Sequence, residues 1–305
     1  MEKTIFALGF FDGVHLGHQA LLHQTVALAR EVGATPGAVT FSTHPDGLVS
    51  GNAPALLNTP GDRDRLLRSY GIEGVLELPF DEELKNTPWA DFLSRLVALG
   101  AAGFVCGDDF RFGAGGAGTA ATLAAFCREQ NLRCAIVPQQ EVDGVRVSST
   151  HIRQLLENGE MKQANRFLGH PHSLSGEVVP GRQLGRTIGI PTANMLLPGG
   201  LAVPKLGVYA AKATVEGKTY PAVTNIGSRP TVGGHQVRAE SWLLDFAGDL
   251  YGKTVTLAFL EFLRPEQKFE SLDELKEQIL KDAQRVRELP SQSRPCRASS
   301  PKGGA

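Results

Sequence analysis

The sequence predicts an α/β domain, with a parallel sheet covered by helices on both faces, followed by an all-β barrel with a C-terminal helix. Three observations predict this order. Strand-type and helix-type apolar patterns alternate up to about residue 138. Residues 173–263 are then rich in valine, threonine, glycine and aromatic side chains, with turn signals at short intervals. A capped amphipathic pattern follows at residues 271–283.

The alternating half begins with an apolar strand and a helix that Gly33 closes. Thr87, followed by Pro88, is expected to cap the start of a later helix. Ligands bind beyond the carboxyl ends of parallel strands, so the loops there are the candidate sites. Strands are expected at Thr4–Leu8, Gly37–Phe41, Gly74–Leu78, Gly103–Cys106 and Arg133–Val137, and helices at Gly17–Val32, Asp62–Tyr70, Pro88–Leu99, Thr119–Gln130, Thr150–Asn158 and Met161–Leu168.

Within the second half, a hairpin is expected at Val208–Val215 and Thr219–Thr224, around the turn Glu216–Gly217. Further strands are expected at Val237–Phe246 and Lys253–Leu263. The closing helix starts at a capping box, Ser271 to Glu274, and should bury Leu275, Ile279 and Ala283. These patterns give domains at residues 1–169 and 170–289, and a tail at 290–305 too poor in apolar residues to fold.

Composition narrows the class of protein. The formal net charge of −1 gives no electrostatic footprint for nucleic acid. The start of the chain lacks the pattern of a signal peptide, and no apolar run is long enough to span a membrane. The cysteines show no CxxC pairing and are expected to be free thiols in a reducing cytoplasm. We therefore expect a cytoplasmic protein that binds neither nucleic acid nor a membrane. The sequence does not set its oligomeric state, which is either a monomer or a transient oligomer.

Residues 9–18 are the most informative segment, because they place two histidines, His15 and His18, where a strand turns into a helix. Free N–H groups and the helix dipole favour a bound phosphate there, and interleaved glycines let the backbone approach it closely. Two imidazoles can then stabilise the charge on a phosphate chain under attack. A solvated or capping role is the alternative, and a zinc pair is another, although no third ligand follows at metal-site spacing.

The His-x-Gly-His turn resembles that of the Rossmann-like nucleotidyltransferase superfamily. The longer pattern Gly-x-Phe-Asp-Gly-x-His-x-Gly-His is similar to the bacterial bifunctional riboflavin kinase/FAD synthetases. The resemblance implies that His15 and His18 act in adenylyl transfer. It also implies an ATP-binding role for Gly9, Phe11, Asp12 and Gly17.

A second segment, residues 146–153, combines hydroxyls, arginines and an expected helix start capped by Ser149 or Thr150. Such groups can cradle a polyphosphate, although a plain cap with exposed arginines is the alternative. The segment resembles the family's Ser-Ser-Thr-x-Ile-Arg motif. This implies that Arg146, Ser149, Thr150 and Arg153 contact the phosphates of ATP.

Two loops after strands are candidates for binding a ring system. In the loop 107–113, an acidic pair lies among aromatic residues, and an exposed loop with a local Arg–Asp pair is the alternative. His44 precedes Pro45 after an earlier strand, and a simple turn residue is the alternative. Both loops resemble family motifs, which implies flavin binding by His44, Asp109, Phe110 and Phe112.

The string 181–194 carries the candidate phosphate and metal site of the second domain. Thr192 and Asn194 alternate along an extended segment, and their oxygens are hard ligands suited to Mg²⁺. A β-turn with polar caps is the alternative. The string closely resembles the flavokinase signature for ATP and Mg²⁺. This implies ATP contacts for Gly181, Gly185, Arg186 and Gly189, with the metal carried by ATP at Thr192 and Asn194.

Glu240 shares a strand face with Trp242 and Leu244. Burying a carboxylate on such an apolar face is unfavourable unless it has an ion-pair partner or a catalytic role. It could take a proton from an attacking hydroxyl as a general base, while a pair with Arg238 is the alternative. In the flavokinases that the chain resembles, the matching glutamate is the catalytic base.

The resemblance covers residues 4 to about 288, with the motifs in family order. It implies ATP-dependent phosphorylation of riboflavin to FMN in the barrel. The α/β domain would then transfer the adenylyl group of ATP to FMN, giving FAD and pyrophosphate. Two other functions remain open at this point. One is a single-activity nucleotidyltransferase for pantetheine phosphate or a cytidylyl substrate, and the other is a non-catalytic flavin-binding or regulatory module.

Overall fold

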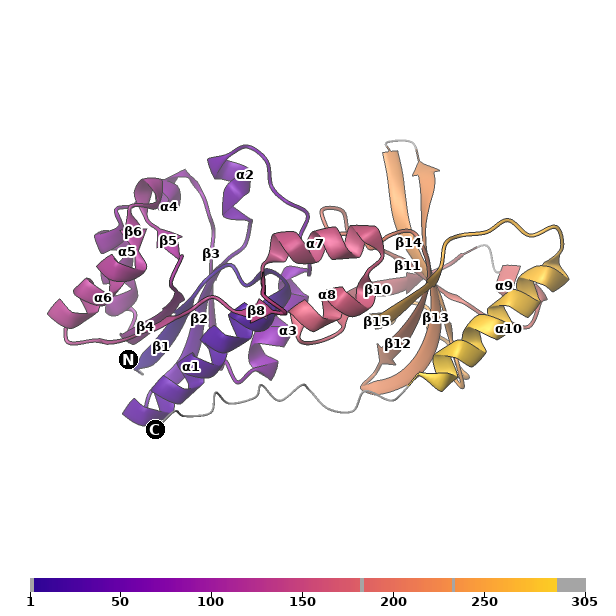
Figure 1. The fold of residues 1–305 in the computed structure, drawn as a ribbon, viewed down its shortest axis with the longest axis horizontal. Helices are drawn as coiled ribbons and strands as arrows, with labels where there is room; N and C mark the ends of the chain where they lie inside the picture. The colour runs from indigo at the N-terminus through magenta and orange to yellow at the C-terminus, as the bar shows by residue number, and fades with distance from the viewer. Residues whose placement is uncertain (1–2, 182–183, 232–233, 290–305) are drawn as a thin grey trace. The chain divides into compact units, whose positions relative to one another are not determined.

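The computed structural model describes residues 3–181, 184–231 and 234–289 (Figure 1). Contacts divide the chain into two compact units. The first runs to His151 and also includes Gly200–Ala202, and the second consists of Ile152–Gly199 and the chain from Val203 onward. The predicted domain boundary after residue 169 stays a prediction, and the expected tail at 290–305 lies outside the described residues.

The first unit is built on a parallel sheet in the order β3-β2-β1-β4-β7 (Figure 1). This confirms the predicted fold class and the predicted strands, with β2 and β4 starting slightly earlier than expected. The central strand β1 is apolar on both faces, with Ile5 and Ala7 fully buried, as a sheet covered on two sides requires. The bounds are β1 Thr4–Leu8, β2 Thr35–Phe41, β3 Gly74–Leu78, β4 Ala101–Gly107 and β7 Arg133–Val137.

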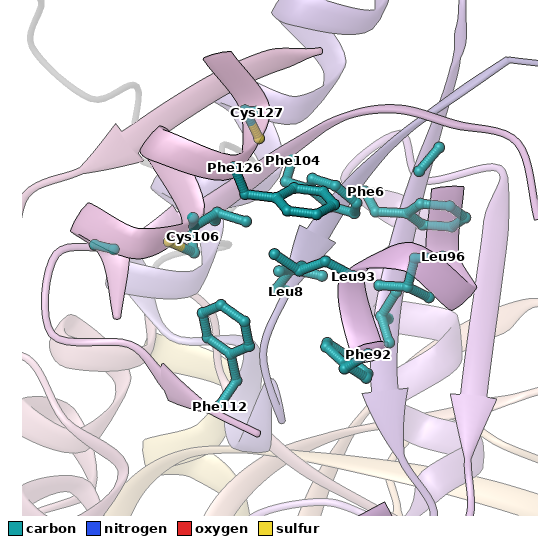
Figure 2. Packing of buried hydrophobic residues seen from close by; sticks show 14 residues of the cluster. Phe6, Leu8, Phe92, Leu93, Leu96, Phe104, Cys106, Phe112, Phe126 and Cys127 are labelled. Carbon is teal, nitrogen blue, oxygen red and sulfur yellow. The ribbon is translucent and has the colours of Figure 1, made fainter. Parts of the chain in front are cut away.

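Helices cover both faces of this sheet. Leu22 of α1 (Leu16–Val32) and Leu67 of α3 (Pro60–Ser69) pack with Ile5 on one face. On the other face, Leu93 of α5 (Trp89–Ala98) and Phe126 of α6 (Ala120–Glu129) meet the side chains of β1 and β4 (Figure 2). The predicted helices are confirmed, and Gly33 closes α1 in the left-handed conformation.

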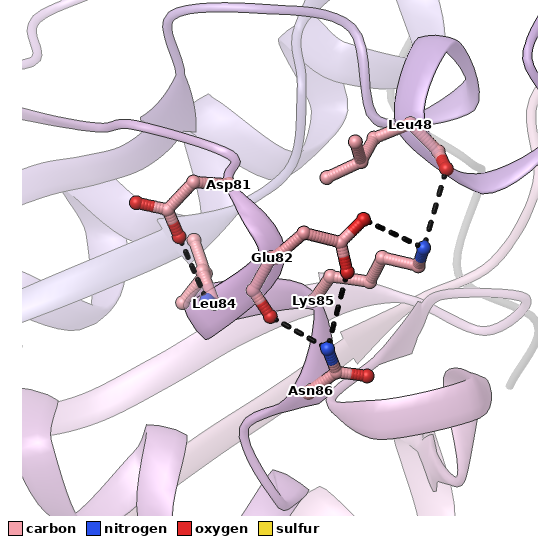
Figure 3. Close-up of polar contacts among 6 residues, drawn as sticks. All are labelled: Leu48, Asp81, Glu82, Leu84, Lys85 and Asn86. Atoms are coloured by element: carbon pink, nitrogen blue, oxygen red, sulfur yellow. Dashed lines mark hydrogen bonds and ion pairs between the residues drawn. The ribbon is translucent and has the colours of Figure 1, made fainter.

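The expected capping role of Thr87 is wrong. A short helix that the sequence patterns did not indicate, α4 (Glu82–Asn86), precedes it, and Thr87 is the residue at its C-terminal end. Its hydroxyl donates to the Glu83 carbonyl at 2.8 Å, and Pro88 takes the position before α5. Asp81 caps α4, and Lys85 extends from it to the Leu48 carbonyl of α2 (Pro45–Val49) at 3.4 Å (Figure 3).

Short elements complete the first unit and lead into the second. They are β5 (Arg111–Phe112) paired with β6 (Gly118–Thr119), β8 (Glu141–Val142) paired with β9 (Val145–Arg146), single 3₁₀ turns at Asp12–Val14 and Ala114–Gly116, and the helices α7 (Ser149–Asn158) and α8 (Met161–Leu168). Gly169 ends α8 in the left-handed conformation. None of the described helices has the length and apolar character needed to cross a membrane.

The second unit is a closed antiparallel barrel in the order β10-β11-β14-β13-β12-β15. The predicted barrel and its hairpin are confirmed, although β13 is much longer than expected and β10 was not anticipated. Inside it, Tyr209 packs on Phe259 with ring centroids 5.4 Å apart. The bounds are β10 His172–Val179, β11 Ala193–Leu196, β12 Gly207–Val215, β13 Lys218–Thr231, β14 Gly234–Leu243 and β15 Thr254–Arg264, with a short helix α9 at Leu184–Thr187.

The closing helix α10 (Leu272–Glu288) lies on the outer face of this barrel. Ser271 caps it as predicted, whereas the Glu274 carboxylate accepts from the Glu270 N–H instead of completing the capping box. Ala283 and Val286 pack against Val208, Ala210 and Val223. The predicted face positions Leu275 and Ile279 are only partly buried, because they line a cavity described below.

An ion pair fixes α10 to the end of β15. The Arg264 guanidinium donates to both carboxylate oxygens of Asp282, at 2.8–3.2 Å, and the Gln278 amide donates to the same carboxylate. Asp282 is 6% exposed and Arg264 14% exposed. A second pair on the same helix, Arg287 with Asp245, is more than half exposed.

We expect Asp282→Asn to lower the stability of the second unit by roughly 3 kcal/mol, because it leaves a largely buried guanidinium without its counter-charge. Arg287→Gln breaks the exposed pair of the same helix and should cost clearly less, since water screens that pair. Calorimetric unfolding of the full chain measures both. Equal losses for the two variants would contradict the assigned importance of the buried pair.

Candidate functional site

The first site surrounds the loop between β1 and α1. The rings of His15 and His18 stack 3.7 Å apart with an interplanar angle of 11°. His15 caps α1, because its Nδ1 accepts the His18 N–H at 3.3 Å. A Cβ at Gly17 would lie 3.2 Å from the His15 ring, so the absence of a side chain there leaves room for the stack. The two histidines thus form one rigid pair at a helix N-terminus, where anions bind.

Burial keeps His18 uncharged. Its Nδ1 is buried and lacks a hydrogen-bond partner among the described residues. The rings of His18 and Phe11 pack in a T-shaped arrangement, with centroids 5.3 Å apart. Burial, and to a lesser degree the nearby His15, holds the pKa of His18 well below its usual value. The neutral imidazole can donate one hydrogen bond and accept another.

Buried hydrogen bonds hold the loop itself. Asp12 is 3% exposed, and its carboxylate accepts the Leu57 N–H at 2.8 Å. The Gly13 N–H donates to Asn58 Oδ1 at 3.3 Å, and the Ser149 hydroxyl donates to the Asp12 carbonyl at 3.0 Å. Two predicted ATP-binding residues, Asp12 and Ser149, thus already have structural partners. Sequence reasoning missed Asn58, which no local pattern marks.

The cap of α7 differs from expectation. The Ser148 hydroxyl accepts the His151 N–H at 3.2 Å, so Ser148 caps the helix, and the prediction of Ser149 or Thr150 is wrong. Ser149 is the first helical residue and is used to tie α7 to the loop between β1 and α1. Thr150 is exposed, which leaves its hydroxyl accessible.

The structure brings together the segments predicted to hold ATP and flavin. Arg146 forms an ion pair with Asp109, and both side chains are half-exposed. His44 caps α2 by accepting the Asp46 N–H, and its ring lies edge-on to Phe10, with centroids 4.6 Å apart. The loops after β1, β2 and β4 therefore meet at one edge of the sheet.

The two aromatic residues of the 107–113 loop have different surroundings. Phe110 stacks on Phe112, with centroids 5.5 Å apart. Phe112 is 7% exposed and belongs to the apolar cluster that contains Phe92 (Figure 2). Phe112 thus packs in the core beneath Phe110, and of the two only Phe110 keeps substantial surface for a ligand.

Sequence reasoning also missed Arg63, a cation that is 2% exposed. Its guanidinium donates to the Phe41 carbonyl at 2.8 Å and lies 4.6 Å from the centre of the Phe10 ring. Burial lowers its pKa, and the nearby Glu77 and Asp12 partly offset that shift. The available signal was its position one helical turn before Leu67, on the stripe of α3 that should be apolar.

The second site lies on the outer face of the barrel. Glu240 of β14 is paired with Asn194 of β11 on one side and with Asn225 of β13 on the other. A cavity of about 220 Å³ lies against this face. Polar groups that line it include Thr192, Asn225, Glu240 and Glu266, and the rest of its wall is mostly apolar: Ile188, Ile190, Val208, Val223, Trp242, Phe269, Leu275 and Ile279.

The glycine-rich string borders this cavity. A Cβ at Gly181 would lie 2.3 Å from the Asn194 amide, so only glycine permits this approach. Gly185 lines the cavity and accepts the Ile190 N–H at 2.7 Å, and Gly189 is exposed in the turn between them. Thr192 and Glu240 line the cavity, and Asn194 lies directly opposite Glu240 in the strand pair. The side chain of Arg186 lies outside the described part of the structure.

The candidate ligands for a metal ion are the hydroxyl oxygen of Thr192 and the amide oxygen of Asn194. Within the described ranges, no group of three or more histidine, cysteine or acidic residues could hold a metal ion. Asn194 is 6% exposed, and the backbone of Gly181 approaches its amide closely. Hard oxygen ligands of this kind suit Mg²⁺ completed by phosphate oxygens.

Comparison with known proteins matches both halves of the chain. A family model described as FAD synthetase matches residues 1–151, and one described as riboflavin kinase matches residues 168–289. The bifunctional riboflavin kinase/FMN adenylyltransferase of Escherichia coli strain K12 is 39% identical over 97% of this chain and 95% of its own length. The protein of that name from Listeria monocytogenes is 35% identical over 93% and 92%.

A solved structure is similar over nearly the whole chain. It is a protein of Streptococcus pneumoniae named as a macrolide-efflux protein, with a TM-score of 0.86 and 32% sequence identity. The match covers 94% of this chain and 95% of that one. The similarity therefore spans both the α/β unit and the barrel.

We expect His18 to stay neutral at pH 6, where an imidazole with the ordinary pKa of about 6.5 is mostly protonated. Below pH 6.5 the unfolded chain takes up a proton that buried His18 does not, so this residue makes the stability of the first unit fall as the pH decreases through that range. NMR of ¹⁵N-labelled imidazoles measures the charge directly. A His18 ring that is half-protonated at pH 6 or above would contradict the prediction.

Proposed function

Because the chain belongs to the family of bifunctional riboflavin kinase/FMN adenylyltransferases, we propose that its two reactions take place at the two sites described above, each within one unit. The protein phosphorylates riboflavin to FMN and transfers the adenylyl group of ATP to FMN. The two family models and the curated relatives carry both activities, so the single-activity and non-catalytic interpretations are set aside. The residue assignments that follow are our proposal.

The kinase reaction is assigned to the cavity beside Glu240. Its apolar walls suit the flavin ring, and its polar end suits the hydroxylated tail. Glu240 takes the proton of the 5′-hydroxyl as that oxygen attacks the γ-phosphorus of ATP, and ADP leaves. Positioning and charge neutralisation supply most of such a rate enhancement. The convergence of Glu240, Thr192 and Asn194 on one face supports this assignment.

Thr192 and Asn194 would hold Mg²⁺ that arrives with ATP. The ion neutralises charge on the phosphate oxygens when it is bound. Gly181, Gly185, Arg186 and Gly189 form the segment over the phosphates, and the close approach of Gly181 to Asn194 supports this placement.

Adenylyl transfer is assigned to the stacked histidines. A phosphate oxygen of FMN attacks the α-phosphorus of ATP, and pyrophosphate leaves in line. His15 and His18 donate hydrogen bonds to the phosphates at the N-terminus of α1, together with the backbone of Gly9, Phe11 and Gly17. Asp12 and Ser149 keep this loop in place through their buried hydrogen bonds.

The remaining contacts of the first site involve both substrates. Arg146 and Thr150 hold the leaving phosphates. Arg153, the other predicted contact of this motif, belongs to the second unit, so its ATP-binding role stays a prediction. His44, Asp109 and Phe110 bind the flavin, with Phe112 supporting the Phe110 ring from below. The ion pair between Arg146 and Asp109, which joins the two binding segments, supports this arrangement.

A cytoplasmic location is also proposed. The free thiols of Cys106, Cys127 and Cys134 support a reducing compartment. The near-neutral charge supports small molecules, not nucleic acids or membranes, as partners. For the oligomeric state we propose a monomer or a transient oligomer.

We expect Glu240→Ala and the isosteric Glu240→Gln to lower FMN formation about 100-fold or more, because both remove the proton acceptor. FAD formation from supplied FMN should be unchanged. Chromatographic separation of flavins measures both reactions. Glu216→Gln, at an exposed hairpin turn, is the matched control. Loss of both activities in the Glu240 variants would contradict the assignment of separate sites.

We expect the reverse pattern for His18→Ala. FAD synthesis from FMN should fall about 100-fold or more, since a preorganised donor to the phosphates is lost. Riboflavin phosphorylation should be unchanged. His23→Ala, on the same helix with its ring against Tyr70, is the control. Full FAD synthesis by the His18 variant would refute the proposed role.

A further inference from the structure

Asn225 occupies a position beside Glu240 that no sequence motif marks. It lies directly opposite Glu240 in the antiparallel pair of β13 and β14, and Asn194 lies opposite Glu240 on the other side. Side chains of directly opposed residues project from the same face of a sheet, about 5 Å apart. Asn194, Glu240 and Asn225 therefore form a polar row across three strands.

The contact with Glu266 fixes the orientation of the Asn225 amide. Asn225 Nδ2 donates to Glu266 Oε1 at 3.0 Å. A carboxylate only accepts hydrogen bonds, so the NH₂ group must face Glu266 and the amide oxygen must point elsewhere. That oxygen is buried, and it has no hydrogen-bond partner in the described part of the chain. A buried amide oxygen without a donor is unfavourable, and a donor supplied by a ligand would relieve this.

Asn225 also stands at the junction of two cavities. The 220 Å³ cavity and a smaller one of about 110 Å³ share Asn225, Glu240 and Glu266 in their walls. The smaller cavity is otherwise lined by Gly227, Ser228 and Arg238, so it is polar, whereas the larger one is mostly apolar. A flavin has the matching division, with an apolar ring system and a tail of hydroxyl groups.

We propose that Asn225, held in orientation by Glu266, is a positioning residue that accepts a hydrogen bond from a hydroxyl of the ribityl tail and thereby directs the terminal hydroxyl towards Glu240. This inference rests on the proposed role of Glu240 as the base. The acceptor recognises a hydroxyl other than the one that reacts, so Asn225 acts on substrate placement and takes no proton.

The test compares riboflavin with analogues that each lack the 2′-, 3′- or 4′-hydroxyl. Wild-type enzyme should discriminate against the analogue that lacks the contacted hydroxyl, by roughly 10-fold or more in kcat/KM. Asn225→Ala should lose a similar factor with riboflavin and show no further loss with that one analogue. The KM for ATP and the rate of FMN adenylylation should be unchanged. An equal loss with riboflavin and with every analogue would overturn the proposal.

Two further variants separate positioning from a structural role. Asn225→Asp keeps the shape but cannot donate to Glu266, so it should lose activity as the alanine variant does. Thr219 lies on the same strand as Asn225 and forms a cross-strand hydrogen bond with Thr214 of β12. The control variant Thr219→Ala should behave as wild type. If Asn225→Asp retains full kinase activity, the proposal fails. If Glu240→Gln is also fully active, the assignment of the site itself fails.

Discussion

Strand register is the constraint on which both sites depend. In the first unit, the parallel pairing of β2, β1 and β4 brings the ends of these strands to one edge, where Phe10, His44 and Asp109 can contribute to one site. In the barrel, β14 pairs with β11 and β13 so that Asn194, Glu240 and Asn225 align. A slip of one residue would turn Glu240 to the barrel interior, because successive side chains of a strand point to opposite faces.

Candidate site residues could be recognised from the sequence where they belong to a contiguous motif. The segments around His15, Thr192 and Glu240 could be recognised because loop glycines, hydroxyls and a carboxylate on an apolar strand each have a local physical meaning. Strands and helices with strong apolar periodicity were predicted close to their bounds for the same reason. The assignment of individual site residues remains a proposal.

Tertiary partners explain what sequence reasoning missed. Ser149 was expected to cap α7, but its hydroxyl is used by the Asp12 carbonyl, 137 positions earlier in the chain, and Ser148 takes the cap. Arg63 is buried because the Phe41 carbonyl and the Phe10 ring receive its guanidinium. The Asn225 amide is oriented by its hydrogen bond to Glu266, which lies 41 positions later in the chain. Of these residues, only Arg63 leaves a trace in the sequence, as a charge on the stripe of α3 that should be apolar.

One small segment crosses the linear order of the chain. Gly200–Ala202, placed between two barrel strands in the sequence, belongs to the first unit, where it forms a bridge with Leu56 through two backbone hydrogen bonds of 2.7 and 2.8 Å. The next residues, Leu57 and Asn58, hold the loop that carries His15. The two halves are thus interlaced, and no single cut yields both intact. A first unit cut from the chain at residue 151 would therefore lack this short bridge beside the segment that holds the His15 loop.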